Sequence, residues 1–545
     1  MGPQQTGIRG MNSFRQYMSW MHTWTGLVFG WVLFFMFVTG SASYYDTEID
    51  RWMQPEHPAP VVIDDPAALL QIGLDHATIE APDADQHFVR IPTSRSYSPF
   101  IFVSWNGFDE NGDRYFGRAE VLADGSVVPE ARETGGGQAL YQMHWAFHYI
   151  PRSIGELIAG IVAFFMFAAI ISGIITHKKI FADFFTLRFG KGQRSWLDAH
   201  NVTSVMSLPY QLMITFTGLI FVVTTLFIPV FVAQYVGSEN IVSAVTEEMF
   251  DQPDAGERTG VRVDMADLGP MVVETQARLG NEPVTQVRVL NPGDETARIN
   301  VRGSFAHTVL RETAGVWFDG PTGEFEKYAP REFKGGDTVI NTMEGLHEGL
   351  FAGPILRIVF FVSGLMGALM ISTGLVHWTR KRRTKLRDNE KAERNLILIE
   401  RMNVGVVAGL PVAIAAYFWA NRLLPTDLAH RADWEMHTIF ITWLVLVIHG
   451  LVREPKHGWT EQLYLGAAAY GLLPVLNGMT SDIHLLNTLP IPGRTGDFAM
   501  AGVDLWFLII GVGLGFAAWV SSRRSRTVPV FEQPKNQPSS TVPAE

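Results

Sequence analysis

Residues 354–387 read PILRIVFFVSGLMGALMISTGLVHWTRKRRTKLR and decide the class of the fold. The first 25 residues are almost wholly apolar, and about 20 such residues suffice for a helix to cross the hydrocarbon core of a bilayer. Six basic residues follow the apolar run, as is typical of the cytoplasmic end of a membrane helix. The stretch therefore predicts a membrane-spanning helix whose C-terminal end faces the cytoplasm.

The same apolar pattern recurs along the chain and predicts a polytopic α-helical membrane protein. The chain has 545 residues, of which 47% are hydrophobic, and this composition suits a polytopic protein with sizeable polar insertions. The least apolar of the predicted spans has Pro474 near its end. We predict about eight transmembrane helices, at residues 20–44, 154–176, 203–234, 354–378, 402–420, 434–451, 462–478 and 501–521.

Basic side chains set the predicted orientation. One cluster separates the second and third spans, one follows the fourth and one follows the eighth, and all three fall on one side if the N-terminus is cytoplasmic. Both chain ends are then expected inside. Because the clusters adjoin apolar spans, we expect a lipid bilayer and no nucleic acid as the partner. The first and third clusters are Lys178, Lys179, Arg188, Lys191 and Arg194, and Arg523, Arg524 and Arg526.

Two long polar segments, residues 46–143 and 236–346, are then expected on the opposite side. Each begins with a helical pattern, continues with an alternating, strand-like run and contains the signal of a hairpin turn. Each is therefore predicted to form a small α+β domain. In order, these features lie at 67–76, 100–103 and 123–125 in the first segment and at 265–279, 297–301 and 319–323 in the second.

The chain also repeats internally. A unit of span, polar segment and span occupies residues 14–180 and recurs at residues 194–380. The two units have the same topology, so a pseudo-two-fold axis along the membrane normal is expected. The repeat places His22 and His200 at corresponding inner ends of the first spans, and His144 and His347 at corresponding outer ends of the second spans.

This pairing of histidines points to haem. One histidine from each unit at the same membrane level is the arrangement that a bis-imidazole haem requires, and it would give one haem b near each face. The chain has no cysteine, which excludes disulfides, cysteine-ligated iron–sulfur clusters and covalent c-type haem. We therefore predict about two haem b groups, with His22, His144, His200 and His347 as axial ligands of the iron.

Three other histidines remain alternatives. His148 could ligate the outer haem or contact one of its propionates, and with His144 it has the i, i+4 spacing of a zinc site. His177 and His377 end the second span of each unit and could replace one of the inner ligands. The sequence has no P-loop and no dinucleotide-binding fingerprint, since the Gly511–Gly515 run lies within an apolar span.

The motifs together resemble the PepSY-associated transmembrane helix family, the iron-regulated membrane proteins. The resemblance covers about residues 10–385. The Trp-Leu-Asp-x-His-Asn and Ser-Gly-Ile-x-x-His-Lys-Lys segments are the most specific parts. The motifs lie at His22–Gly26, Met143–His148, Ser172–Ile174, His177–Phe181, Trp196–Asn201 and Leu346–Gly349.

The resemblance implies two periplasmic PepSY-like domains in a bacterial inner membrane, with cytoplasmic termini. It divides the chain into transmembrane helix 1 (10–45), PepSY-like domain 1 (46–143), helices 2–3 with a basic loop (144–235), PepSY-like domain 2 (236–346), helix 4 (347–380), a C-terminal four-helix extension (402–521) and a disordered tail (527–545).

Some members of this family are similar to ferric-siderophore reductases with two b-type haems. The resemblance thus implies a transmembrane oxidoreductase for iron acquisition that reduces a periplasmic ferric siderophore or other iron chelate with electrons from a cytoplasmic or quinol donor. Two alternatives remain from the sequence. The repeat could form a siderophore or iron permease, or the polar domains could regulate a periplasmic peptidase. Haem content separates the reductase from both.

Overall fold

The computed structural model describes residues 13–58, 65–93, 95, 100–108, 112–177, 180–182, 184, 186–188, 192–233, 256–329, 335–383, 390–489, 491 and 497–526. The predicted tail and five of the basic residues that set the predicted orientation lie outside these ranges: Lys178, Lys179, Lys191, Lys385 and Arg387.

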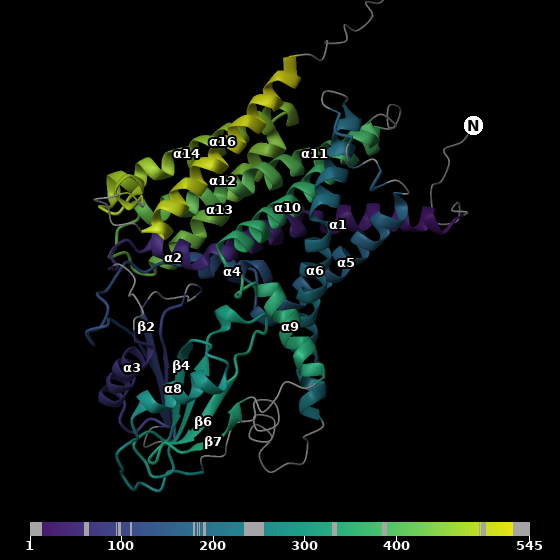
Figure 1. Ribbon diagram of the computed structural model, residues 1–545. Coiled ribbons are helices and arrows are strands. Elements are labelled where there is room, and N and C mark those ends of the chain that lie inside the picture. Colours follow the sequence, from purple (N-terminus) through teal and green to yellow (C-terminus); the bar gives the residue numbers. More distant parts are fainter. Residues whose placement is uncertain are drawn as a thin grey trace, which may run out of the picture.

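Long helices dominate the described chain (Figure 1). Seven helical segments are long and apolar enough to cross a membrane, and they correspond to seven of the eight predicted spans. The long helices are α1 (Phe14–Ala42), α5 (Arg152–Thr176), α6 (Gln193–Ala233), α10 (Pro354–Arg383), α11 (Glu390–Asn403) continued through the π-helix η4 (Val404–Ala408) into α12 (Gly409–Leu423), α13 (Arg431–Val452), α14 (Pro455–Thr480) and α16 (Phe498–Arg526).

The predicted span at 462–478 lies within α14, which is not among the seven apolar segments. Its sequence contains many glycine and alanine residues and the buried polar side chains of Gln462 and Asn477. The helix packs along α16 and also against α12. Its polar residues are thus accommodated between helices, where they find hydrogen-bond partners.

The helices of the two repeat units form a four-helix group. The first helix of each unit packs against the second of the same unit, α1 against α5 and α6 against α10, and the units meet where α1 contacts α10 and α5 contacts α6. One hydrophobic core continues from this group into the C-terminal helices. It includes Phe34 of α1, Ile371 of α10, Leu410 of α12 and Phe507 of α16.

The polar segments of the two units build a single antiparallel sheet, which lies at one end of the helices with α2, α4 and α9 between (Figure 1). Its strand order is β3-β2-β1-β4-β5-β6-β7. The strands are β1 (Gln86–Arg90), β2 (Ile101–Phe108) and β3 (Arg114–Val121) from the first segment, and β4 (Val284–Leu290), β5 (Arg298–Gly303), β6 (Gly315–Asp319) and β7 (Phe325–Ala329) from the second.

The two segments meet where β1 pairs with β4, from Gln86 opposite Leu290 to Arg90 opposite Gln286. Each segment is predicted from the sequence to form a small domain, whereas the strands of both segments form one continuous sheet. Pairing β1 with β4 satisfies the backbone groups of an edge that each three- or four-stranded half would otherwise expose. The turn at 319–323 does join β6 to β7, and the turn at 123–125 follows β3.

One face of this sheet is covered by the two helices that the sequence predicts. They are α3 (Pro66–Glu80) and α8 (Leu268–Arg278). Side chains from both helices, such as Leu70 and Met271, form one hydrophobic core with Val89, Val287 and Val301 of the sheet. The shorter helices are η2 (Ser43–Tyr45), α2 (Asp46–Met53), α4 (Gly136–Trp145), η3 (Phe305–His307), α9 (Gly336–Glu348) and α15 (Leu485–Thr488).

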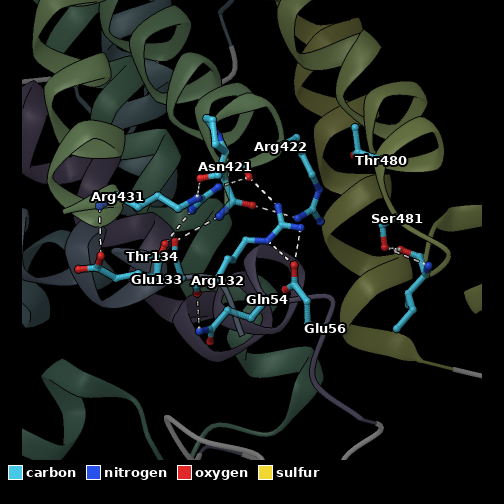
Figure 2. A network of polar contacts seen from close by, with 12 residues as sticks. Gln54, Glu56, Arg132, Glu133, Thr134, Asn421, Arg422, Arg431, Thr480 and Ser481 are labelled. Atoms are coloured by element: carbon cyan, nitrogen blue, oxygen red, sulfur yellow. Dashed lines mark hydrogen bonds and ion pairs between the residues drawn. The ribbon is translucent and has the colours of Figure 1, made fainter. Parts of the chain in front are cut away.

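The C-terminal helices attach to the first repeat unit through buried polar side chains (Figure 2). Arg431 and Glu435 of α13 form an ion pair in which both side chains are fully buried. Glu435 also accepts hydrogen bonds from Thr134 (2.6 Å) and from the backbone N–H of Gly135 (3.1 Å), just before α4. Asn421 of α12 donates to the other oxygen of Glu435 at 2.9 Å.

A second group of contacts joins the same helices to α2. The guanidinium of Arg422 lies over the ring of Trp52 and donates to the Trp52 carbonyl oxygen and to Asn477 (2.9 Å). The indole N–H of Trp52 donates to Asp504 at 2.9 Å. These contacts fix the C-terminal helices to α2, which follows α1 in the first unit.

Candidate functional site

Two histidines from the first helix of each unit face each other across the helix group. His22 lies on α1 and His200 on α6, and their ring centres are 6.2 Å apart. The Nδ1 atom of His22 donates to the carbonyl oxygen of Ala169 on α5 at 2.8 Å. The Nδ1 atom of His200 donates to the carbonyl oxygen of Met370 on α10, also at 2.8 Å. We call His22 and His200 the distal pair.

A second pair lies nearer the sheet, on the short helices α4 and α9. The ring centres of His144 and His347 are 6.1 Å apart. The Nδ1 atom of His144 donates to the carbonyl oxygen of Met36 on α1 at 2.8 Å, and that of His347 donates to Ile214 on α6 at 3.1 Å. We call His144 and His347 the proximal pair. Both pairs are built in the same way. In the distal pair, histidines on α1 and α6 donate to carbonyl oxygens on α5 and α10, whereas in the proximal pair, histidines on α4 and α9 donate to carbonyl oxygens on α1 and α6.

A glycine accompanies every one of these histidines. A Cβ atom at Gly173 or Gly374 would lie 3.0 or 3.1 Å from the ring of His22 or His200. A Cβ atom at Gly40 or Gly218 would approach His144 or His347 even more closely, to 2.5 or 2.9 Å. Each glycine lies four residues after the carbonyl that accepts the Nδ1 bond, so one helical turn provides both the acceptor and the space. The four glycines are therefore part of the site.

The hydrogen bonds fix the tautomer of each ring. A carbonyl oxygen only accepts, so Nδ1 must carry the proton, and the lone pair is left on Nε2. Burial lowers the pKa of His144. Burial and the neighbouring His144 lower the pKa of His347 to about 3. Both rings of the proximal pair are hence neutral at pH 7, as a metal-ligating imidazole must be.

The two pairs are well separated along the helices. Gly40 follows His22 by 18 residues on α1, and Gly218 follows His200 by 18 residues on α6. At 1.5 Å per residue this spacing corresponds to about 27 Å. The identical interval in both units places the pairs at two levels of the helix group, one near each end of the membrane-crossing segments.

The geometry of each pair fits two axial ligands of one iron. Two metal–nitrogen bonds of about 2 Å, together with the radii of the two rings, place ring centres roughly 6 Å apart. Each pair supplies only two nitrogen ligands, whereas zinc in proteins takes three or four protein ligands. Within the described residues no group of three or more His, Cys, Asp or Glu side chains could hold a metal ion. A porphyrin supplies the other four ligands itself, so the residues present fit haem.

The alternative histidines lie beside the pairs. The ring of His148 stacks on Phe440 of α13, with ring centres 5.5 Å apart, and adjoins Tyr149. His177 ends α5, where Asn201 lies 3.3 Å from its Nε2 atom. His377 on α10 lies 3.4 Å from the carbonyl oxygen of Gln193. In the part of the chain that the structure describes, neither His148 nor His377 faces a second imidazole in the way that the four repeat-matched histidines do.

The carbonyl and glycine partners of the histidines were not predicted from the sequence. The signal was present, because Gly40 and Gly218 lie at the same interval after matching histidines, and Gly173 and Gly374 both stand in the motif before the second span ends. Reading it would have required knowing which helices are neighbours. Only the folded structure supplies that information.

The match to a family of known proteins agrees with the membrane architecture. No curated protein is significantly similar to the chain. Residues 19–381 match the family described as the PepSY-associated TM region. This match covers well over half of the chain and includes all four paired histidines, and the protein belongs to this family.

Proposed function

We propose that the protein is a di-haem b transmembrane reductase of the bacterial inner membrane, which passes electrons to a periplasmic ferric chelate. The observation that carries this proposal is the pair of facing imidazoles at each of two levels, His22 with His200 and His144 with His347. When bound at both levels, haem would supply one-electron transfer through the membrane. Such transfer needs no acid or base residue.

The residues of the chain would hold and tune these groups. Each Nδ1–H···O=C bond orients its ring and raises the basicity of Nε2. The glycines allow each ring to lie against the neighbouring helix. Burial of the rings would exclude water from a bound haem, which is one means by which a protein sets the reduction potential of the iron. The direction of transfer follows from the proposed orientation, with a cytoplasmic or quinol donor at the distal pair and the chelate at the proximal pair.

Haem content tests this proposal directly. We expect about two b-type haems per chain in protein purified from cells supplied with iron and haem, because two pairs of ligands are present. The pyridine haemochrome assay measures the ratio, and the reduced α-band identifies the haem type. Folded protein with negligible haem would overturn the reductase and favour a permease or a peptidase regulator.

Orientation has its own test. The basic residues after α5 and at the C-terminal ends of α10 and α16 predict that the sheet faces the periplasm. We expect an alkaline phosphatase fusion after Gly125, in the turn that follows β3, to be active and a green fluorescent protein fusion there to be dark. A fusion beyond the end of α16 should give the reverse pattern. A fluorescent reporter at Gly125 would contradict the proposed orientation.

A further inference from the structure

The face of the sheet that turns away from α3 and α8 carries charged and aromatic side chains. Phe88 of β1, Arg288 of β4, Asn300 of β5 and Trp317 of β6 are direct cross-strand neighbours in one row. Arg302 lies two residues beyond Asn300 on β5 and so points to the same face. This row crosses the junction between the two repeat units. We call Arg288, Arg302 and Trp317 the donor cluster.

Arg288 is partly buried, and within the described residues it forms no ion pair with an acidic side chain. Its Nε atom is buried and has no hydrogen-bond partner, and its guanidinium lies 5.9 Å from the centre of the Phe88 ring. Burial lowers the pKa of Arg288, and among the described residues no acidic side chain offsets that effect. Burying the Nε–H donor of a guanidinium without an acceptor is unfavourable.

The neighbouring side chains of Arg302 and Trp317 also have buried N–H donors without acceptors. The Nε atom of Arg302 is also buried without a partner, although its Nη2 atom donates to the carbonyl oxygen of Thr313 at 2.9 Å. Burial and then the charge of Arg288 lower the pKa of Arg302. Trp317 is 2% exposed, and its indole N–H has no acceptor. Three adjacent strands therefore each present a buried N–H donor that lacks an acceptor.

The chemistry of this cluster is that of an anion site. All three unmatched groups donate and none accepts, and two of them carry positive charge. A ligand that satisfies them must offer several acceptor oxygens and negative charge. Carboxylates do so, and they match the planar fork of arginine with two parallel hydrogen bonds. What distinguishes these three buried donors is that they lie together on adjacent strands, where one ligand could satisfy all of them.

The donor cluster is connected to the proximal histidine pair. From Thr313, which accepts from Arg302, the chain leads back within two residues to Arg311. Arg311 pairs with Glu348 on α9 at 3.2 Å, next to His347. Its guanidinium also lies 5.3 Å from the ring of Phe221, which in turn is 5.4 Å from the ring of His347. A ligand at the cluster would thus lie on the sheet next to the segment that packs on α9.

Resting on the proposed function, we propose that the donor cluster binds the substrate, and that the substrate is an anionic, carboxylate-bearing ferric chelate. Arg288 and Arg302 would each donate hydrogen bonds to a carboxylate of the chelate, and the indole N–H of Trp317 would donate to a further oxygen. The site would recognise charge and oxygen donors rather than a particular scaffold. All three donors lie on strands of the second polar segment, and Phe88 of the first segment lies beside Arg288.

Gallium(III) citrate tests this assignment without any electron transfer, because gallium(III) is not reduced under these conditions. Calorimetric titration of the full-length, haem-loaded protein in detergent should show binding. Arg288→Gln and Arg302→Gln should each weaken it about tenfold or more, since each removes a charge-assisted hydrogen bond. The matched control is Arg118→Gln, which removes an exposed charge from the same row of the sheet on β3 and should leave the affinity unchanged.

Stability separates a binding role from a structural one. Removing an unmatched buried charge should leave the melting temperature of Arg288→Gln unchanged or raise it. A fall in melting temperature together with lost binding would overturn the proposal, as would wild-type affinity in both variants. The proposal would also be overturned if inorganic phosphate, or citrate without gallium, bound as tightly as gallium citrate. Haem content, measured on the same samples, tells a failure of the proposed reductase apart from a failure of this site.

Discussion

Replacing His144 or His347 by alanine is expected to lower the haem content from about two to about one per chain. The two rings face each other at 6.1 Å, so each variant removes one of two axial ligands from the same site. Haem at the distal pair should be retained, because His22 and His200 lie about 27 Å away along the helices. The pyridine haemochrome assay and a spectral redox titration measure the loss and identify which component remains.

The pairing gives a stricter form of the same prediction. The double variant His144→Ala with His347→Ala should lose no more haem than either single variant, because both changes affect one site. His22→Ala and His200→Ala should instead remove the other redox component. If His22→Ala and His144→Ala lost the same component, the assignment of the pairs to two levels would be wrong.

His148→Ala is the matched control. His148 lies four residues after His144, and its ring stacks on Phe440 rather than facing a second imidazole. Its replacement should leave the haem content at the wild-type value. His377→Ala serves the same purpose at the distal level, where the ring lies near the carbonyl oxygen of Gln193. Loss of a haem in either control would restore these residues as ligands.

Much of the membrane architecture and the pairing of the histidines could be predicted, because the chain has long apolar runs and an internal repeat. Apolar runs gave the spans, and correspondence between the two units singled out His22 with His200 and His144 with His347. Predicting these two pairs required no knowledge of how the helices pack, because a pseudo-two-fold axis by itself brings corresponding residues of the two units to one membrane level. Their role as haem ligands stays a prediction.

Features that depend on contacts between distant elements could not be predicted in this way. The carbonyl acceptors of the histidines lie more than 100 residues away in the sequence. The pairing of β1 with β4 joins segments that are separated by two membrane helices, and local patterns such as the strand-like runs give no information about partner strands. The position of Phe88 beside Arg288 of the donor cluster also arises only from that pairing.

The buried ion pair of the C-terminal helices leads to the second large expected effect. Glu435→Ala leaves the guanidinium of Arg431 fully buried without its carboxylate, which costs about 3–5 kcal/mol of stability for a pair of this kind. The change also deprives Thr134 and the N–H of Gly135 of their acceptor, just before α4. We expect a lower melting temperature and, since α4 carries His144, preferential loss of haem from the proximal pair.

Two further variants show whether the buried charge of Arg431 is responsible for the expected loss of stability. Glu461→Ala removes a carboxylate from the same bundle, but its pair with Arg453 is exposed and should contribute little to stability. Adding Arg431→Met to Glu435→Ala should recover part of the lost stability, because replacing both members of a buried pair is far less costly than breaking it. If Glu435→Ala melts like the wild type and retains both haem components, the C-terminal helices do not hold α4 in place, and the position of His144 is fixed by its contacts with α1 alone.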